Sequence, residues 1–103
     1  MSKTVVVGPL SELPENQGFL FRSGPFQIAV FREGETVRAI DNTCPHAGAA
    51  LAFGYVEGNS VCCPWHCWEF DLTSGKCITV EGADVETFSV TIEDGVVSLA
   101  LPE

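Results

Sequence analysis

Two short cysteine–histidine pairs constrain the fold more than any other feature of this 103-residue chain. The first pair reads C-x-H at Cys44 and His46, and the second reads C-x2-H at Cys63 and His66, with sixteen residues between the pairs. The sequence contains no other histidine. Thiolate and imidazole are metal ligands, and a metal held by both pairs would tie two distant segments of a small chain together.

The order of the ligand types separates two kinds of metal site. A zinc module more often groups its ligands by type, as C-x2–4-C followed by H-x3–5-H, whereas each segment here supplies one Cys and one His. This mixed pattern favours a [2Fe–2S] cluster, in which one iron takes both thiolates and the other takes both imidazoles. A zinc-stabilised interaction domain is the less favoured alternative.

The rest of the chain predicts an all-β fold, an antiparallel sandwich or small barrel. Apolar and polar residues alternate on both sides of Asp94-Gly95, a pair typical of a two-residue hairpin turn. Little strand pattern is present in residues 41–50 and 64–68, so two irregular loops are expected to carry the Cys/His pairs. Further hairpins are expected around Glu33-Gly34-Glu35 and Ser23-Gly24-Pro25, and a first strand at Val5 to Val7.

Length and charge narrow the class of protein further. The length predicts a single domain over residues 1–103. Fourteen acidic residues against five basic ones argue against binding to nucleic acid or to an anionic membrane. Residues 57–103 carry nine acids and only Lys76, which suits either a basic partner or an ordinary solvated surface. Because no signal peptide or membrane span is visible, a cytoplasmic location is expected, where cysteine clusters indicate metal sites before disulfides.

The segments CPHAGAAL and CPWHCWEFDLTSG resemble the two cluster loops of Rieske proteins in ligand type, order and spacing. The resemblance covers nearly the whole chain and implies one [2Fe–2S] cluster. It implies that Cys44 and Cys63 hold one iron, and that His46 and His66 hold the other. Cys62 does not fit the spacing, because it would give C-x3-H.

The resemblance also implies a branch of the family. High-potential members, as in cytochrome bc complexes, have one further Cys in each loop, and this chain has Ala49, Pro64 and Trp65 at the places concerned. Those members also carry Ser and Tyr hydroxyls, which donate toward the cluster sulfurs, where this chain has Trp68 and Phe70. Fewer donors predict a low potential within the class, as in a soluble Rieske-type ferredoxin.

Several residues of the second loop have open roles. The family usually has Gly directly after the second His, and this chain has Cys67. Cys62, Cys67 and Cys77 are expected to be small buried hydrophobes, with a disulfide between two of them as the less favoured alternative. Trp65 is expected either to cover the loop as a lid or to contact a partner. Glu69 and Asp71 are expected to face solvent.

These features predict an electron carrier that is not itself an enzyme and has no small-molecule substrate. It would take one electron from a reductase and pass it to a terminal oxygenase, partners that the family resemblance implies. A self-contained oxygenase would need further histidines for a second iron, and the predicted cluster uses both. The alternative is a small Rieske subunit of a larger reductase, such as NAD(P)H-dependent nitrite reductase.

Overall fold

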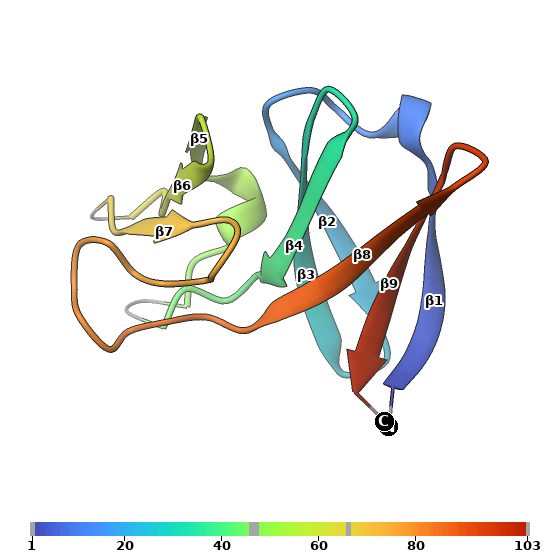
Figure 1. Cartoon of the computed structure of the whole chain (residues 1–103). Coiled ribbons are helices and arrows are strands. Elements are labelled where there is room, and N and C mark those ends of the chain that lie inside the picture. Colours follow the sequence, from blue (N-terminus) through green and yellow to red (C-terminus); the bar gives the residue numbers. More distant parts are fainter. Residues whose placement is uncertain (1, 46–47, 66, 103) are drawn as a thin grey trace.

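A computed structural model describes residues 2–45, 48–65 and 67–102 of the chain, and within them nine strands form two antiparallel sheets (Figure 1). The six-stranded sheet has the order β1 (Ser2–Pro9), β9 (Val96–Pro102), β8 (Thr87–Glu93), β4 (Thr36–Asp41), β3 (Phe26–Glu33) and β2 (Gly18–Ser23). The three-stranded sheet has the order β5 (Tyr55–Glu57), β6 (Ser60–Cys62) and β7 (Glu69–Asp71). Two short 3-10 helices, η1 (Leu10–Glu12) and η2 (Leu51–Phe53), lie between strands.

The predicted hairpins are confirmed, and local turn chemistry explains them. β8 and β9 pair up to Glu93 and Val96, which leaves Asp94 and Gly95 as the turn. Both turn residues have positive φ, at 51° and 75°, as a two-residue turn between twisted strands requires. The turns between β3 and β4 and between β2 and β3 also lie where the sequence predicts them.

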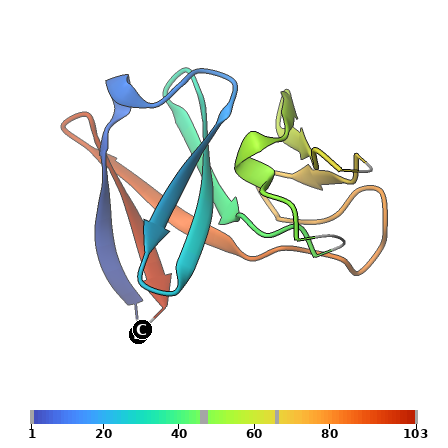
Figure 2. The ribbon, with the colours of Figure 1, turned by 180° about the vertical axis from the view of Figure 1, so that it is seen from behind.

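The large sheet is curled, and the small sheet lies against one side of it (Figures 1 and 2). Strand β3 explains this arrangement, since residues 28–31 are buried on both faces of the sheet. Ile28 and Val30 pack into a core formed with β4 and β9, which we call the sheet core. Ala29 and Phe31 point the other way, into a core shared with the small sheet and both predicted cluster loops, which we call the site core.

The two cores have different members. The buried residues of the sheet core are Leu13, Ile28, Val30, Val37, Ala39, Val97, Leu99 and Leu101. The buried residues of the site core are Ala29, Phe31, Ile40, Cys44, Ala49, Leu51, Ala52, Val61, Cys63, Phe70, Leu72 and Cys77. The predicted site therefore stands on the outer face of β3 and β4.

Close backbone approach fixes the short helix η2, which leads into β5, against the large sheet. Gly18 in β2 lies so close to the backbone of Ala52 in η2 that a Cβ at residue 18 would collide with it.

Within the described residues, every helical stretch is too short to span a lipid bilayer.

Candidate metal centre

The first loop begins at the end of β4 and is held by a buried asparagine. Asn42 is 3% exposed, and its side-chain oxygen accepts a hydrogen bond from the N–H of Ala52 at 2.8 Å. The N–H of Cys44 donates to the carbonyl of Ala49 at 2.9 Å, and the N–H of Gly48 donates to the carbonyl of Cys44 at 2.8 Å. These bonds close the loop on itself and place Cys44 at its base, facing the site core.

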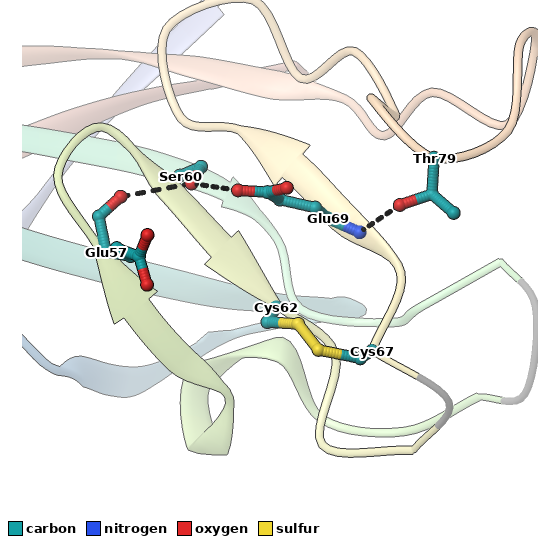
Figure 3. The surroundings of a disulfide bond; sticks show 6 residues. All are labelled: Glu57, Ser60, Cys62, Cys67, Glu69 and Thr79. Carbon is teal, nitrogen blue, oxygen red and sulfur yellow. Dashed lines mark hydrogen bonds between the residues drawn. A yellow bond between two sulfur atoms is a disulfide. The ribbon is translucent and has the colours of Figure 1, made fainter.

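The second loop joins β6 to β7 and is closed at its base in the same way. The N–H of Cys63 donates to the carbonyl of Trp68 at 2.7 Å. Beside this bond, Cys62 and Cys67 form a disulfide with their Cα atoms 4.9 Å apart (Figure 3). We call these two links together the loop neck.

The structure brings the two predicted cysteine ligands together. Cys44 and Cys63 are each 1% exposed, and both lie in the site core with their thiols close enough to interact, although nineteen positions separate them in the chain. Burial raises the pKa of the Cys63 thiol, the backbone N–H of Trp65 acts in the opposite direction, and the Cys44 thiol raises the pKa further. Two adjacent buried thiols disfavour two thiolates unless a cation balances their charge, and a bound metal supplies that charge.

The two predicted histidine ligands, His46 and His66, lie outside the described residues. The residues that the structure describes contain no group of three or more potential metal ligands, so the two thiols are the described part of the predicted donor set. They come from different loops and meet in the site core, an arrangement that would suit two ligands of one iron.

The disulfide corrects one sequence prediction and partly confirms another. Cys62 and Cys67 are not small buried hydrophobes, because they are cross-linked and Cys67 is exposed. Cys77 is buried in the site core, as predicted. A signal for the pair was present in the sequence, since these two cysteines flank the C-x2-H segment on both sides and Cys67 replaces the usual Gly.

The return from the second loop is held by two carboxylates, Glu69 and Asp71, which are half-exposed on the opposite face from Phe70, as predicted, and also bind neighbouring groups. The backbone N–H groups of Thr73 and Ser74 donate to Asp71 Oδ1 at 2.8 and 2.9 Å and hold its pKa below the ordinary value. Glu69 accepts a 2.7 Å hydrogen bond from the Ser60 hydroxyl (Figure 3). Both acids therefore help to shape the base of the site.

Aromatic residues differ sharply in exposure around the site. Phe70 is fully buried, whereas Trp65 is 59% exposed, which favours partner contact over a closed lid. The sequence prediction missed two further exposed aromatics, Phe53 at 68% and Tyr55 at 69%. Tyr55 lies opposite Cys62 in the small sheet.

Comparison with known proteins identifies the class that this fold and this pair of loops define. The family described as the Rieske [2Fe-2S] domain matches residues 3–89, and the chain belongs to that family. It is 33% identical over 97 residues to the 3-phenylpropionate/cinnamic acid dioxygenase ferredoxin subunit of Shigella flexneri serotype 5b (strain 8401), covering 92% of this chain and 91% of that protein.

Solved structures extend the likeness to three dimensions. The ferredoxin of carbazole 1,9a-dioxygenase from Nocardioides aromaticivorans IC177 is 27% identical, with a TM-score of 0.88 over 98% of this chain and 99% of that one. A protein described as an NADH-dependent nitrite reductase small subunit from Mycobacterium tuberculosis has a TM-score of 0.92 over 100% and 98% of the two chains. Its 21% identity makes it a likeness of fold alone.

Membership in this family brings a [2Fe–2S] cluster as the cofactor, and the described residues fit it. A Rieske cluster needs two thiolates at one iron. Cys44 and Cys63 meet that need, because they are free, adjacent and shielded from water.

Proposed function

We propose that Cys44 and Cys63 hold one iron of the [2Fe–2S] cluster, and that His46 and His66 hold the other. The observation that carries this proposal is the meeting of two buried thiols at the bases of two loops with the patterns C-x-H and C-x2-H. Cys62 is unsuitable as a ligand because its sulfur is bonded to Cys67.

The chain then acts as an electron carrier, which takes one electron from a reductase and passes it to a terminal oxygenase. When bound, the cluster supplies one-electron redox chemistry. The names of the relatives, ferredoxins of dioxygenase systems, support the choice of partner. The protein has no substrate of its own in this role, and we place the exchange in the cytoplasm.

The protein side chains bind the cluster, exclude water from the thiolates and form the docking surface. Pro45 and Trp65 are exposed beside the two cysteine ligands and form an apolar contact area. An apolar centre within a polar rim is the usual anatomy of a transient interface. The acidic balance of the chain adds long-range attraction to a basic partner, which mainly raises the association rate.

A second candidate is a permanent small subunit of an NAD(P)H-dependent nitrite reductase. The fold itself is common to both kinds of protein, and sequence identity is greater with the ferredoxin subunits. We therefore rank the oxygenase ferredoxin first.

The test begins with the purified holoprotein. We expect two irons and two acid-labile sulfides per chain, and a Rieske-type EPR signal after reduction. Stoichiometric zinc, or the EPR signal of a cluster with four thiolate ligands, would contradict the ligand assignment. Electron transfer assays then offer the reduced protein to a dioxygenase oxygenase component and to a nitrite reductase large subunit. Transfer only to the latter, in a complex that survives gel filtration, would establish the second candidate.

A further inference from the structure

The disulfide lies in an unusual place, directly against the segment that carries two proposed ligands. Cys62 immediately precedes Cys63, and Cys67 immediately follows residue 66. The supporting ladder is short, because β6 and β7 pair over only three positions each, from Ser60 to Cys62 and from Glu69 to Asp71. The loop neck therefore holds the loop with the disulfide (Figure 3) and with a hydrogen bond from the N–H of Cys63 to the carbonyl of Trp68.

Burial does not explain the choice of cysteine at residue 67. Its side chain is exposed, and its backbone has φ of 53°, in the left-handed region that disfavours residues with a Cβ. An exposed residue in a costly conformation needs a compensating interaction, and its described interaction is the covalent bond to Cys62. The cross-link thus offsets the local backbone cost and holds the neck closed.

We propose that the Cys62–Cys67 disulfide is a redox-controlled clamp, which fixes the second cluster loop when it is intact and loosens that loop when a dithiol reductant cleaves it. This inference rests on the proposed role of Cys63 as an iron ligand. Cys62 and Cys67 are positioning residues in it, since they act on the cluster through the backbone of the loop.

The clamp would be opened by thiol–disulfide exchange, and the structure favours attack at Cys67 over attack at Cys62. A thiolate of the dithiol reductant attacks the sulfur of Cys67, the more exposed residue of the pair, and the bond to Cys62 breaks. The second thiol of the reductant then displaces Cys67, so that two electrons and two protons have moved to the protein and the reductant leaves as a disulfide. A dithiol system is the expected partner in a cytoplasm, where disulfides that do form are usually transient or sensing.

Reduction removes one of the two links at the neck. Cys67 then keeps an unfavourable backbone without its covalent partner, and of the two links that define the neck the hydrogen bond from Cys63 to Trp68 remains. The loop should open more often, which exposes the iron–thiolate bond of Cys63 to water and chelators. Cluster release should become faster as a result.

The experiment follows cluster loss in the holoprotein with EDTA at a fixed temperature, using the visible absorbance of the cluster. Protein is compared with and without prior treatment with TCEP, and alkylation with mass spectrometry counts accessible thiols in each sample. We expect reduction to add two alkylated cysteines and to shorten the half-life of the cluster about tenfold, within the range expected for loss of a loop cross-link.

A double variant, Cys62→Ala with Cys67→Gly, provides the matched control. It removes the cross-link and places at residue 67 the amino acid that tolerates positive φ. We expect its cluster to be released faster than that of the oxidised wild type and its half-life to be insensitive to TCEP. The wild-type measurement keeps the test decisive if this variant loads no cluster.

Three results would overturn the clamp. One is full alkylation of Cys62 and Cys67 in oxidised holoprotein without reductant. Another is an unchanged half-life after mass spectrometry has verified reduction. The third is a double variant that keeps the wild-type half-life. A sample without the Rieske EPR signal would instead refute the proposed function, so the two failures are distinguishable.

Discussion

The substitution Phe70→Tyr tests why a low reduction potential is expected. Phe70 is fully buried in β7 and belongs to the site core with Cys44 and Cys63. By the family resemblance, high-potential members carry a Tyr at this position, and its hydroxyl donates toward a cluster sulfur. Without that donor, we expect a wild-type potential on the order of −150 mV, at the low end of the Rieske range.

The size of the effect follows from the strength of one hydrogen bond to a charged acceptor, about 1.5–3 kcal/mol net. Only the difference in bond strength between the reduced and the oxidised cluster changes the potential. If that difference is about 1.4 kcal/mol, the one-electron potential rises by about 59 mV. We therefore expect Phe70→Tyr to raise the potential by about 60 mV.

Protein-film voltammetry at neutral pH measures this directly on wild type, Phe70→Tyr and the control Phe88→Tyr. Phe88 lies in β8 and is half-buried, and its ring packs edge-on against the ring of Phe26. Both side chains belong to the partly buried residues that pack against the sheet core. The control should leave the potential unchanged, because the added hydroxyl is on the other core.

A different pattern would refute the reasoning. If the new hydroxyl finds no acceptor, it costs about 1–3 kcal/mol of stability. Each kcal/mol lowers Tm by about 4–8 °C in a domain of this size. A lowered Tm with an unchanged potential would show that residue 70 does not tune the cluster, and a wild-type potential above zero would contradict the premise.

Three further predictions concern ligands, docking and pH. Cys63→Ala and His46→Ala should each lose the cluster, while Cys62→Ala should still load two irons. Iron analysis of the purified variants checks this. A colourless Cys62→Ala together with an iron-loaded Cys63→Ala would reverse the ligand assignment. Trp65→Ala should slow electron transfer to the oxygenase about tenfold without changing the reduction potential, and the wild-type rate should fall as the salt concentration rises. Stopped-flow rates measured over a salt series test both expectations. Unchanged rates would place the docking surface elsewhere. The lowered pKa of Asp71 means that its stabilising effect is complete above its ordinary value of 3.8 and is lost as pH falls through the lower folded value. Asp71→Ala should therefore have a lower Tm than wild type at neutral pH. Acidification below pH 3.8 should lower the Tm of this variant by less than it lowers the Tm of wild type, and circular dichroism melts measure both decreases. Equal decreases in the two proteins would count against this role of Asp71.

The sequence by itself determined the hairpins and the class of site. The turn at Asp94-Gly95 depends on the φ values that two adjacent residues tolerate, so neighbours in sequence suffice to predict it. The pairs C-x-H and C-x2-H likewise carry their chemistry in residue type and spacing, and the shared metal that we propose predicts that Cys44 and Cys63 meet, as they do in the site core.

Only the tertiary structure decided which residues face the core and which cysteines are cross-linked. Alternation places Ile92 on the same face as Phe88, yet Ile92 is 38% exposed, at the end of β8 that lies beyond the two positions where β8 pairs with β4. The partner of Cys62 depended on the pairing of β6 with β7, which brings residue 67 back to the loop neck. Contacts of this kind arise from strand register and from layers packed across the chain, and one-dimensional spacing does not contain that information.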